Sequence, residues 1–175
     1  MQDLELAAAA KAGSRDAFIS LIRKNETMLY SIANGILRSR PDVLDAIQET
    51  ILQAYKEIAR LREPAYFRTW LVRILINECR RVIRHNRKVI PVEHLQDKRA
   101  GSHALESDLE LLDLLDGLGM DQKEIVVLYY LEDLSIQEIA GIVDLSESGV
   151  KSRLHRARIK LEALMREPAM KEELP

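Results

Sequence analysis

Five basic side chains follow a helix-turn-helix pattern in the last third of the sequence. Such a motif needs a small residue where two helices touch, a short turn, and a cap for the second helix. Ala140 is the small residue, Val143 and Leu145 bracket the turn, Ser146 is the cap, and Val150 returns to the core. The basic residues that follow are Lys151, Arg153, Arg156, Arg158 and Lys160, against one acid, Glu147. Since a basic helix of this kind can contact base edges and phosphates in a major groove, the pattern predicts duplex DNA binding.

A second basic cluster ends a predicted helix in the middle of the chain. Its members are Arg80, Arg81, Arg84, Arg87 and Lys88. Upstream on the same helix lie Phe67, Arg68, Thr69, Trp70, Arg73 and Asn77. Arginine, aromatic and amide side chains together suit unpaired bases, which stack on rings and are read on their edges. Cations at a helix C-terminus also favour the helix dipole, and we expect Trp70 to be a core residue in preference to a stacking platform.

A polar stripe marks a third helix. Asp45, Gln48, Glu49 and Leu52 recur at positions i, i+3, i+4 and i+7, which places them on one face, opposite the apolar face of the same helix. Two interpretations stay open for this stripe, a protein interface and an ordinary solvated face.

No constellation for catalysis or metal binding is present in the sequence. There is no glycine-rich phosphate loop and no nucleophile elbow, and the four histidines lack metal-ligand spacing. The one cysteine, Cys79, cannot form an internal disulfide, which favours the reducing cytoplasm. The longest apolar run, Ile125 to Leu131, is too short to cross a bilayer, and the first residues lack the pattern of a signal peptide. We expect a cytoplasmic binding protein that is not an enzyme and uses no cofactor, metal or small-molecule substrate.

The elements that position these residues are predicted to be helices. The 175 residues are 47% hydrophobic and 31% charged, with only 7 Gly and 5 Pro, and apolar residues recur at steps of three and four. We expect an all-α fold with two small domains, residues 1–92 and 113–175, joined by a flexible linker over 93–112. The net charge of −2 hides a split between a basic first part and an acidic second part, so local patches matter more than the total.

Three caps mark predicted helix starts. Ser14 precedes one apolar stripe, and the Asp121 to Glu124 and Ser135 to Glu138 segments have the spacing of capping boxes. Between the two boxes, the apolar run over 125–131 is predicted to be a buried helix.

Taken together, these stretches resemble a bacterial RNA polymerase sigma factor of the extracytoplasmic-function (ECF) class, in the sigma-70 family. The segment DAIQET at 45–50 is similar to the family's core-binding helix, and FRTWL at 67–71, with Arg73, Ile74 and Asn77, to its promoter-melting segment. The segment from Glu138 to Arg158 is similar to its second DNA-binding domain.

The resemblance implies a factor that binds core RNA polymerase, recognises the minus-35 and minus-10 promoter elements and promotes initiation. Asp45, Gln48, Glu49 and Leu52 would face the clamp helices of the largest polymerase subunit, and the flap would be a further contact. Leu61, Arg62 and Asn77 would surround a flipped minus-10 base, with Arg68, Arg73, Arg80, Arg81 and Arg84 nearby. The minus-35 element would be contacted by Ser148, Lys151, Ser152, Arg153 and Arg156. An anti-sigma factor is a further partner implied by the family.

One alternative from another class stays open at this point. A transcription regulator could bind a duplex operator through the helix-turn-helix and sense a signal through its N-terminal helices. Binding to core RNA polymerase discriminates the two functions, because a sigma factor requires that binding and a stand-alone regulator does not.

Overall fold

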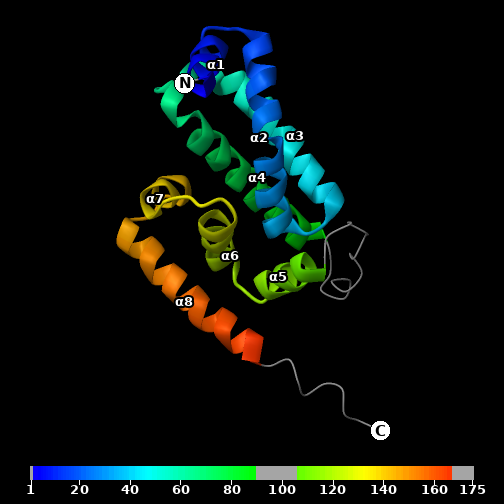
Figure 1. The fold of residues 1–175 in the computed structure, drawn as a ribbon. Coiled ribbons are helices and arrows are strands. Elements are labelled where there is room, and N and C mark those ends of the chain that lie inside the picture. Colours follow the sequence, from blue (N-terminus) through cyan, green and yellow to red (C-terminus); the bar gives the residue numbers. More distant parts are fainter. Residues whose placement is uncertain (1, 90–105, 167–175) are drawn as a thin grey trace. The chain divides into compact units, whose positions relative to one another are not determined.

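The computed structural model describes residues 2–89 and 106–166, and these residues form helices without any strand. The chain divides into two compact units, residues 1–100 and 101–175 (Figure 1). The prediction of an all-α fold with two small domains is therefore confirmed. Of the predicted linker over 93–112, residues 93–105 lie outside the described residues. The linker prediction was wrong for residues 106–112, because these residues belong to a helix.

The first unit is built on three long helices. These are α2 (Arg15–Leu37), α3 (Arg40–Glu57) and α4 (Phe67–Val89), and each contacts the other two (Figure 1). Ser14 caps α2 as predicted, because its Oγ accepts a hydrogen bond from the Ala17 N–H at 3.3 Å. Fully buried side chains of α2 and α4, among them Leu29, Ile32, Leu71 and Leu75, form the core. One face of α4 is thus fixed inward, which leaves its basic face exposed.

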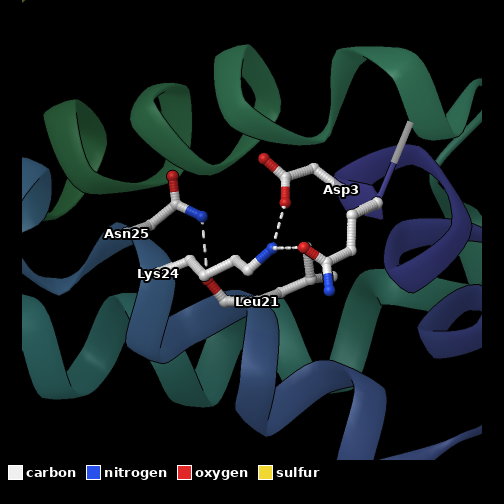
Figure 2. Close-up of polar contacts among 5 residues, drawn as sticks. Asp3, Leu21, Lys24 and Asn25 are labelled. Carbon is white, nitrogen blue, oxygen red and sulfur yellow. Dashed lines mark hydrogen bonds and ion pairs between the residues drawn. The ribbon is translucent and has the colours of Figure 1, made fainter.

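A short N-terminal helix, α1 (Gln2–Lys11), packs against α2 and against two 3₁₀ turns. The turns are η1 (Ile58–Arg60) and η2 (Pro64–Tyr66), and they connect α3 to α4. Figure 2 shows Lys24 of α2 in contact with Asp3 at the start of α1. The Lys24 ammonium donates hydrogen bonds to Asp3 Oδ1 at 2.6 Å and to Gln2 Oε1 at 3.3 Å. The hydrogen bond from Lys24 lowers the pKa of the Asp3 carboxyl.

The second unit contains four helices in its described part. They are α5 (Glu106–Asp116), α6 (Met120–Val126), α7 (Ile136–Val143) and α8 (Glu147–Arg166). A π-helical turn, η4 (Val127–Leu131), continues α6, so the predicted helix over 125–131 is confirmed with an altered last turn. Ile125, Leu128, Ile139 and Ile142 are fully buried and form the core with the inner face of α8.

The two predicted capping boxes have different outcomes. Ser135 and Glu138 form the box, since the Glu138 N–H donates to Ser135 Oγ at 3.2 Å and the Ser135 N–H donates to Glu138 Oε2 at 2.9 Å. The box at Asp121 was predicted wrongly, because Gly119 is the N-cap residue of α6 and has no side chain to bond with. Glu124, the expected partner in that box, is buried within the unit.

None of the described helices combines the length and the apolar character that crossing a membrane would require.

Candidate nucleic-acid and polymerase interfaces

The turn between α7 and α8 has the geometry of a helix-turn-helix. Asp144 ends α7 in the left-handed conformation (φ 56°), and the Leu145 N–H donates to the Ala140 carbonyl at 3.0 Å. Ser146 then caps α8, because its Oγ accepts from the Gly149 N–H at 3.1 Å. Val150 is fully buried, so the turn, the cap and the inward residue predicted from the sequence are all confirmed.

The outer face of α8 presents most of the residues predicted to contact the minus-35 element. Val150, Leu154 and Ala157 face the core. Ser148, Lys151, Ser152 and Arg156 are exposed. The Arg156 Nε donates a hydrogen bond to the Ser152 carbonyl, one turn earlier in α8, at 3.3 Å. This bond orients the Arg156 side chain along the helix. The arrangement offers hydroxyl and cationic donors along one side of a single helix, as contacts to base edges and phosphates require.

Arg153 differs from its neighbours because it is turned toward α6. Its side chain is 32% exposed, and Nη1 lies 3.3 Å from Asp121 Oδ2 in an ion pair. The pair borders a hollow of about 450 Å³ between the start of α6 and the basic side of α8. Its lining residues are Gly119, Met120, Asp121, Gln122, Arg153, Arg156 and Lys160. Asp121 therefore offsets part of the positive charge at the predicted minus-35 surface.

Arg158, counted among the five cations of α8, is held by the π-helical turn. Its Nε donates to the Tyr130 hydroxyl oxygen at 2.7 Å, and its guanidinium lies 5.7 Å from the Tyr129 ring centre and 5.8 Å from that of Tyr130. The hydrogen bond to Tyr130 raises the pKa of Arg158. Nothing in the sequence pattern of α8 distinguishes this arginine, because its partners come from η4.

On the first unit, α4 presents the predicted minus-10 residues on one face. Arg73, Asn77 and Arg84 are exposed and Arg80 is half-buried, at spacings of four, three and four residues that keep them in line along a helix. Arg68 is exposed near the start of α4, and its Nε lies 3.2 Å from Met28 Sδ of α2. The amide of Asn77 thus lies in the middle of a row of guanidinium groups.

Arg81 lies at the edge of this row, toward α3. Its Nε forms an ion pair with Glu78 Oε2 at 2.6 Å. The pKa of Arg81 is raised chiefly by the hydrogen bond to Glu78, and the charge of Glu49 on α3 adds to the shift. The charge of Arg81 thus interacts with Glu49, a residue of the polar stripe of α3.

The turn before α4 corrects one sequence-based expectation. Leu61 is only 4% exposed, so its side chain belongs to the hydrophobic core and does not wall an open pocket for a base. Arg62, the next residue, is exposed, and its carbonyl accepts a hydrogen bond from Lys11 Nζ at 3.1 Å. The sequence analysis also missed Tyr66, whose side chain is 66% exposed at the end of η2. Trp70 is half-buried, and its ring centre lies 5.9 Å from that of Phe67.

The polar stripe of α3 is exposed along its whole length. Asp45, Gln48 and Glu49 are exposed, and Leu52 is 45% exposed. Two further large side chains of α3, Leu44 and Tyr55, belong to its apolar periodicity and are nevertheless about half exposed. Carboxylates beside exposed apolar groups suit a protein partner with basic and apolar side chains.

Within the described ranges, no group of histidine, cysteine, aspartate and glutamate side chains could hold a metal ion. Cys79 is buried in the first unit.

Comparison with known proteins supplies two family matches and several relatives. Residues 21–89 match "Sigma-70 region 2" and residues 108–161 match "Sigma-70, region 4". The chain is 31% identical over 165 residues to the ECF RNA polymerase sigma factor SigM of Mycobacterium tuberculosis, covering 93% of this chain and 84% of that protein. It is also 31% identical over 179 residues to the RNA polymerase sigma factor CnrH of Cupriavidus metallidurans, covering 93% and 94% of the two chains.

A solved structure of CnrH in complex with the cytosolic domain of CnrY has a TM-score of 0.77 to this chain, at 28% identity, and covers 97% of this chain and 100% of that one. The matched regions contain the α3 stripe, the α4 row and the α8 face described above. The chain belongs to the ECF sigma factors of the sigma-70 family.

Proposed function

We propose that this sigma factor uses three surfaces in sequence during initiation: the α3 stripe for core RNA polymerase, the α8 face for the minus-35 element, and the α4 row for the minus-10 element. The observation that carries the proposal is the exposure of an amide, Asn77, in a row of arginines on a helix whose opposite face is buried. Such a row supports contact with an opened strand as well as with phosphates.

The minus-35 contact is proposed for the exposed donors of α8. Ser148, Lys151 and Ser152 come from the first turns of the helix, which a helix-turn-helix protein directs at base edges. Arg156, one turn further on, suits a phosphate. Arg153 would exchange Asp121 for DNA on binding, since its present partner is a carboxylate 72% exposed to solvent.

The minus-10 contact is proposed for α4 and the turn before it. Arg62, Arg68, Arg73, Arg80 and Arg84 would hold the strand backbone. Asn77 would hydrogen-bond a base taken out of the stack, and these contacts would offset the cost of unstacking, a few kcal/mol. Leu61 would act from the core by supporting the turn, because its side chain is buried.

Core binding is proposed for Asp45, Gln48, Glu49 and Leu52. Charged side chains on an exposed helix face steer and orient a partner of opposite charge, here the clamp helices of the largest polymerase subunit. The half-exposed Leu52 and Leu44 would add apolar contact area to the same surface. The polymerase flap is proposed as the partner of the second unit.

An anti-sigma factor is proposed as a further partner. The related CnrH was solved with the cytosolic domain of CnrY, and the exposed apolar side chains of α3 suit a protein that would cover the polymerase-binding surface. The chain would act in the cytoplasm, where transcription takes place, as a binding factor and not as an enzyme.

The test is transcription in vitro with purified core polymerase, this chain and fragmented genomic DNA, followed by sequencing of the 5′ ends of the transcripts. We expect initiation at a set of sites that share two upstream elements, and none with core polymerase alone. Binding of the chain to duplex DNA without core binding and without new start sites would instead identify a stand-alone regulator.

A further inference from the structure

A basic corner lies in the first unit where α2 ends, α3 begins and α4 ends (Figure 1). Asn86 Nδ2, near the end of α4, donates a hydrogen bond at 2.9 Å to Asp42 Oδ2 in the first turn of α3. The bond brings residues 38–42 next to residues 84–88, and we define these two segments as the basic corner. Its charged groups are one carboxylate, Asp42, and five cations, Arg38, Arg40, Arg84, Arg87 and Lys88.

Most cations of the basic corner have no acidic partner. No carboxylate in the described part of the chain pairs with four exposed members, which are Arg40, Arg84, Arg87 and Lys88. The Asp42 carboxylate is half-buried and accepts the hydrogen bond from Asn86. Arg84 and Lys88 are four residues apart on α4, a spacing at which like charges destabilise a helix. An anion from outside the chain would relieve this repulsion.

Arg38 occupies a turn conformation that disfavours its residue type. Its φ is 64° and its ψ is −38°, and the Ser39 N–H donates to the Leu37 carbonyl at 2.7 Å across it. This geometry is close to the rare γ-turn, which is strained. Glycine or asparagine is the usual residue with positive φ at the end of a helix. The backbone therefore does not account for an arginine here, whereas the charge that it adds beside Arg40 does.

The composition of the basic corner identifies a polyanion as the partner. Neither segment contains a large apolar side chain, so the corner lacks the apolar centre of a protein interface. Its one amide, Asn86, is bonded to Asp42, and it has no Phe, Tyr or Trp. It therefore also lacks the groups that hold an unpaired base. Arginine and lysine side chains alone suit backbone phosphates, which position duplex DNA without revealing its sequence.

Along α4, the basic corner follows the row that is proposed to hold the opened strand. Arg87 is 10 residues beyond Asn77, which corresponds to roughly 15 Å of helix, or about four base-pair steps of duplex. The unit proposed to bind the minus-35 element comes after α4 in the chain. This order assigns the end of α4 to the upstream side of the minus-10 element.

We infer that the basic corner binds backbone phosphates of the duplex directly upstream of the minus-10 element, with Arg40 of α3 as a contact outside α4. The inference rests on the proposed function, because it requires that the α4 row holds the minus-10 strand. The contact would add affinity without a base preference, since phosphates carry no sequence information.

The experiment compares holoenzymes that carry Arg40→Ala, Arg40→Lys or the control Arg15→Ala. Arg15 is a matched control, because it is also exposed and is also the first residue of a helix that follows a serine. The probes come from a promoter found by transcription in vitro. One is a fork-junction DNA whose duplex runs upstream from the minus-10 element through the minus-35 element, and the other is a single-stranded oligonucleotide of the minus-10 element alone.

We expect Arg40→Ala to lower the slope of log K against log salt by about one unit on the fork probe, as loss of one duplex phosphate contact does. Arg40→Lys and Arg15→Ala should keep the wild-type slope, and none of the three variants should change binding to the oligonucleotide. Replacing the base pairs between the two promoter elements should leave the loss unchanged.

Three outcomes would overturn the inference. A wild-type slope and affinity of Arg40→Ala on the fork probe would show that this residue contacts no DNA. Equal weakening on the oligonucleotide would assign the corner to the unpaired strand, and weaker core binding would assign it to the polymerase. The proposed function fails separately, if the wild-type holoenzyme binds the fork probe no better than core polymerase does.

Discussion

Arg158 is anchored to Tyr130 across the second unit by a hydrogen bond of 2.7 Å between Nε and the phenol oxygen. The guanidinium also lies over the rings of Tyr129 and Tyr130, which themselves pack edge to face. This contact joins α8 to the π-helical turn. Of the five cations of α8, Arg158 is thus held by η4 and Arg153 pairs with Asp121 of α6, whereas Lys151 and Arg156 are exposed on the outer face.

The first prediction separates Arg156 from Arg158. We expect Arg156→Ala to weaken binding to a minus-35 duplex and to lower the slope of log K against log salt by about one unit, as loss of a phosphate contact does. Arg158→Ala should change that slope less and lower the melting temperature more, because it loses the tyrosine contact. Fluorescence anisotropy at several salt concentrations and thermal unfolding check both. Equal salt slopes for the two variants would contradict this separation.

The second prediction concerns the Asp121 to Arg153 ion pair. We expect Asp121→Asn to tighten duplex binding at low salt by about 1.5- to 5-fold, because an exposed pair of this kind is worth roughly 0.2–1 kcal/mol and opposes DNA binding here. Asp133→Asn, at another exposed carboxylate of the same unit, is the control. Weaker binding by Asp121→Asn would mean that Asp121 orients Arg153 for DNA.

The third prediction concerns the α3 stripe. Exchanging Asp45 and Glu49 for lysine should reduce affinity for core polymerase by more than about tenfold, since both attraction and hydrogen bonds to a cationic partner are lost. Glu26→Lys reverses an exposed charge on α2 and serves as the control. Affinity is measured by titration of labelled protein with core polymerase, and native affinity of the double variant would exclude the stripe from the interface.

The fourth prediction concerns strand opening. The Asn77→Ala holoenzyme should keep core binding and minus-35 binding but lose permanganate reactivity of unpaired thymines near the start site. Ser20→Ala, an exposed polar truncation on α2, should leave opening unchanged. If Asn77→Ala opens promoters as well as the wild type does, then Asn77 reads no base, because truncation of a merely exposed side chain costs less than about 0.5 kcal/mol.

Local signals in the sequence predict the helices and their exposed faces well. The caps at Ser14, Ser135 and Ser146 act within three residues, and the apolar periodicity assigns the buried face of α8 without knowledge of its neighbours. Such features depend on contacts close in sequence, which a pattern records directly.

Features that depend on distant contacts were missed. Leu61 is buried because η1 and the helix α1 pack beside the turn, which no spacing within residues 58–64 records. Arg153 and Arg158 find their partners on α6 and η4. One local feature was also predicted wrongly: Gly119, in place of Asp121, is the N-cap residue of α6, because an N-cap is selected by backbone conformation as well as by residue type.

The bond from Lys11 to the Arg62 carbonyl and the bonds from Lys24 to Gln2 and Asp3 (Figure 2) have a consequence for dissecting the protein. The region 2 match begins at residue 21, inside α2 and beyond all of α1. A fragment trimmed to that boundary would lose the Ser14 cap and the only described side chain that holds the Arg62 carbonyl. It would retain α3 and α4, but the turn before α4 would have lost its contact with Lys11. We therefore expect promoter preferences measured on such a fragment to differ from those of the 175-residue chain.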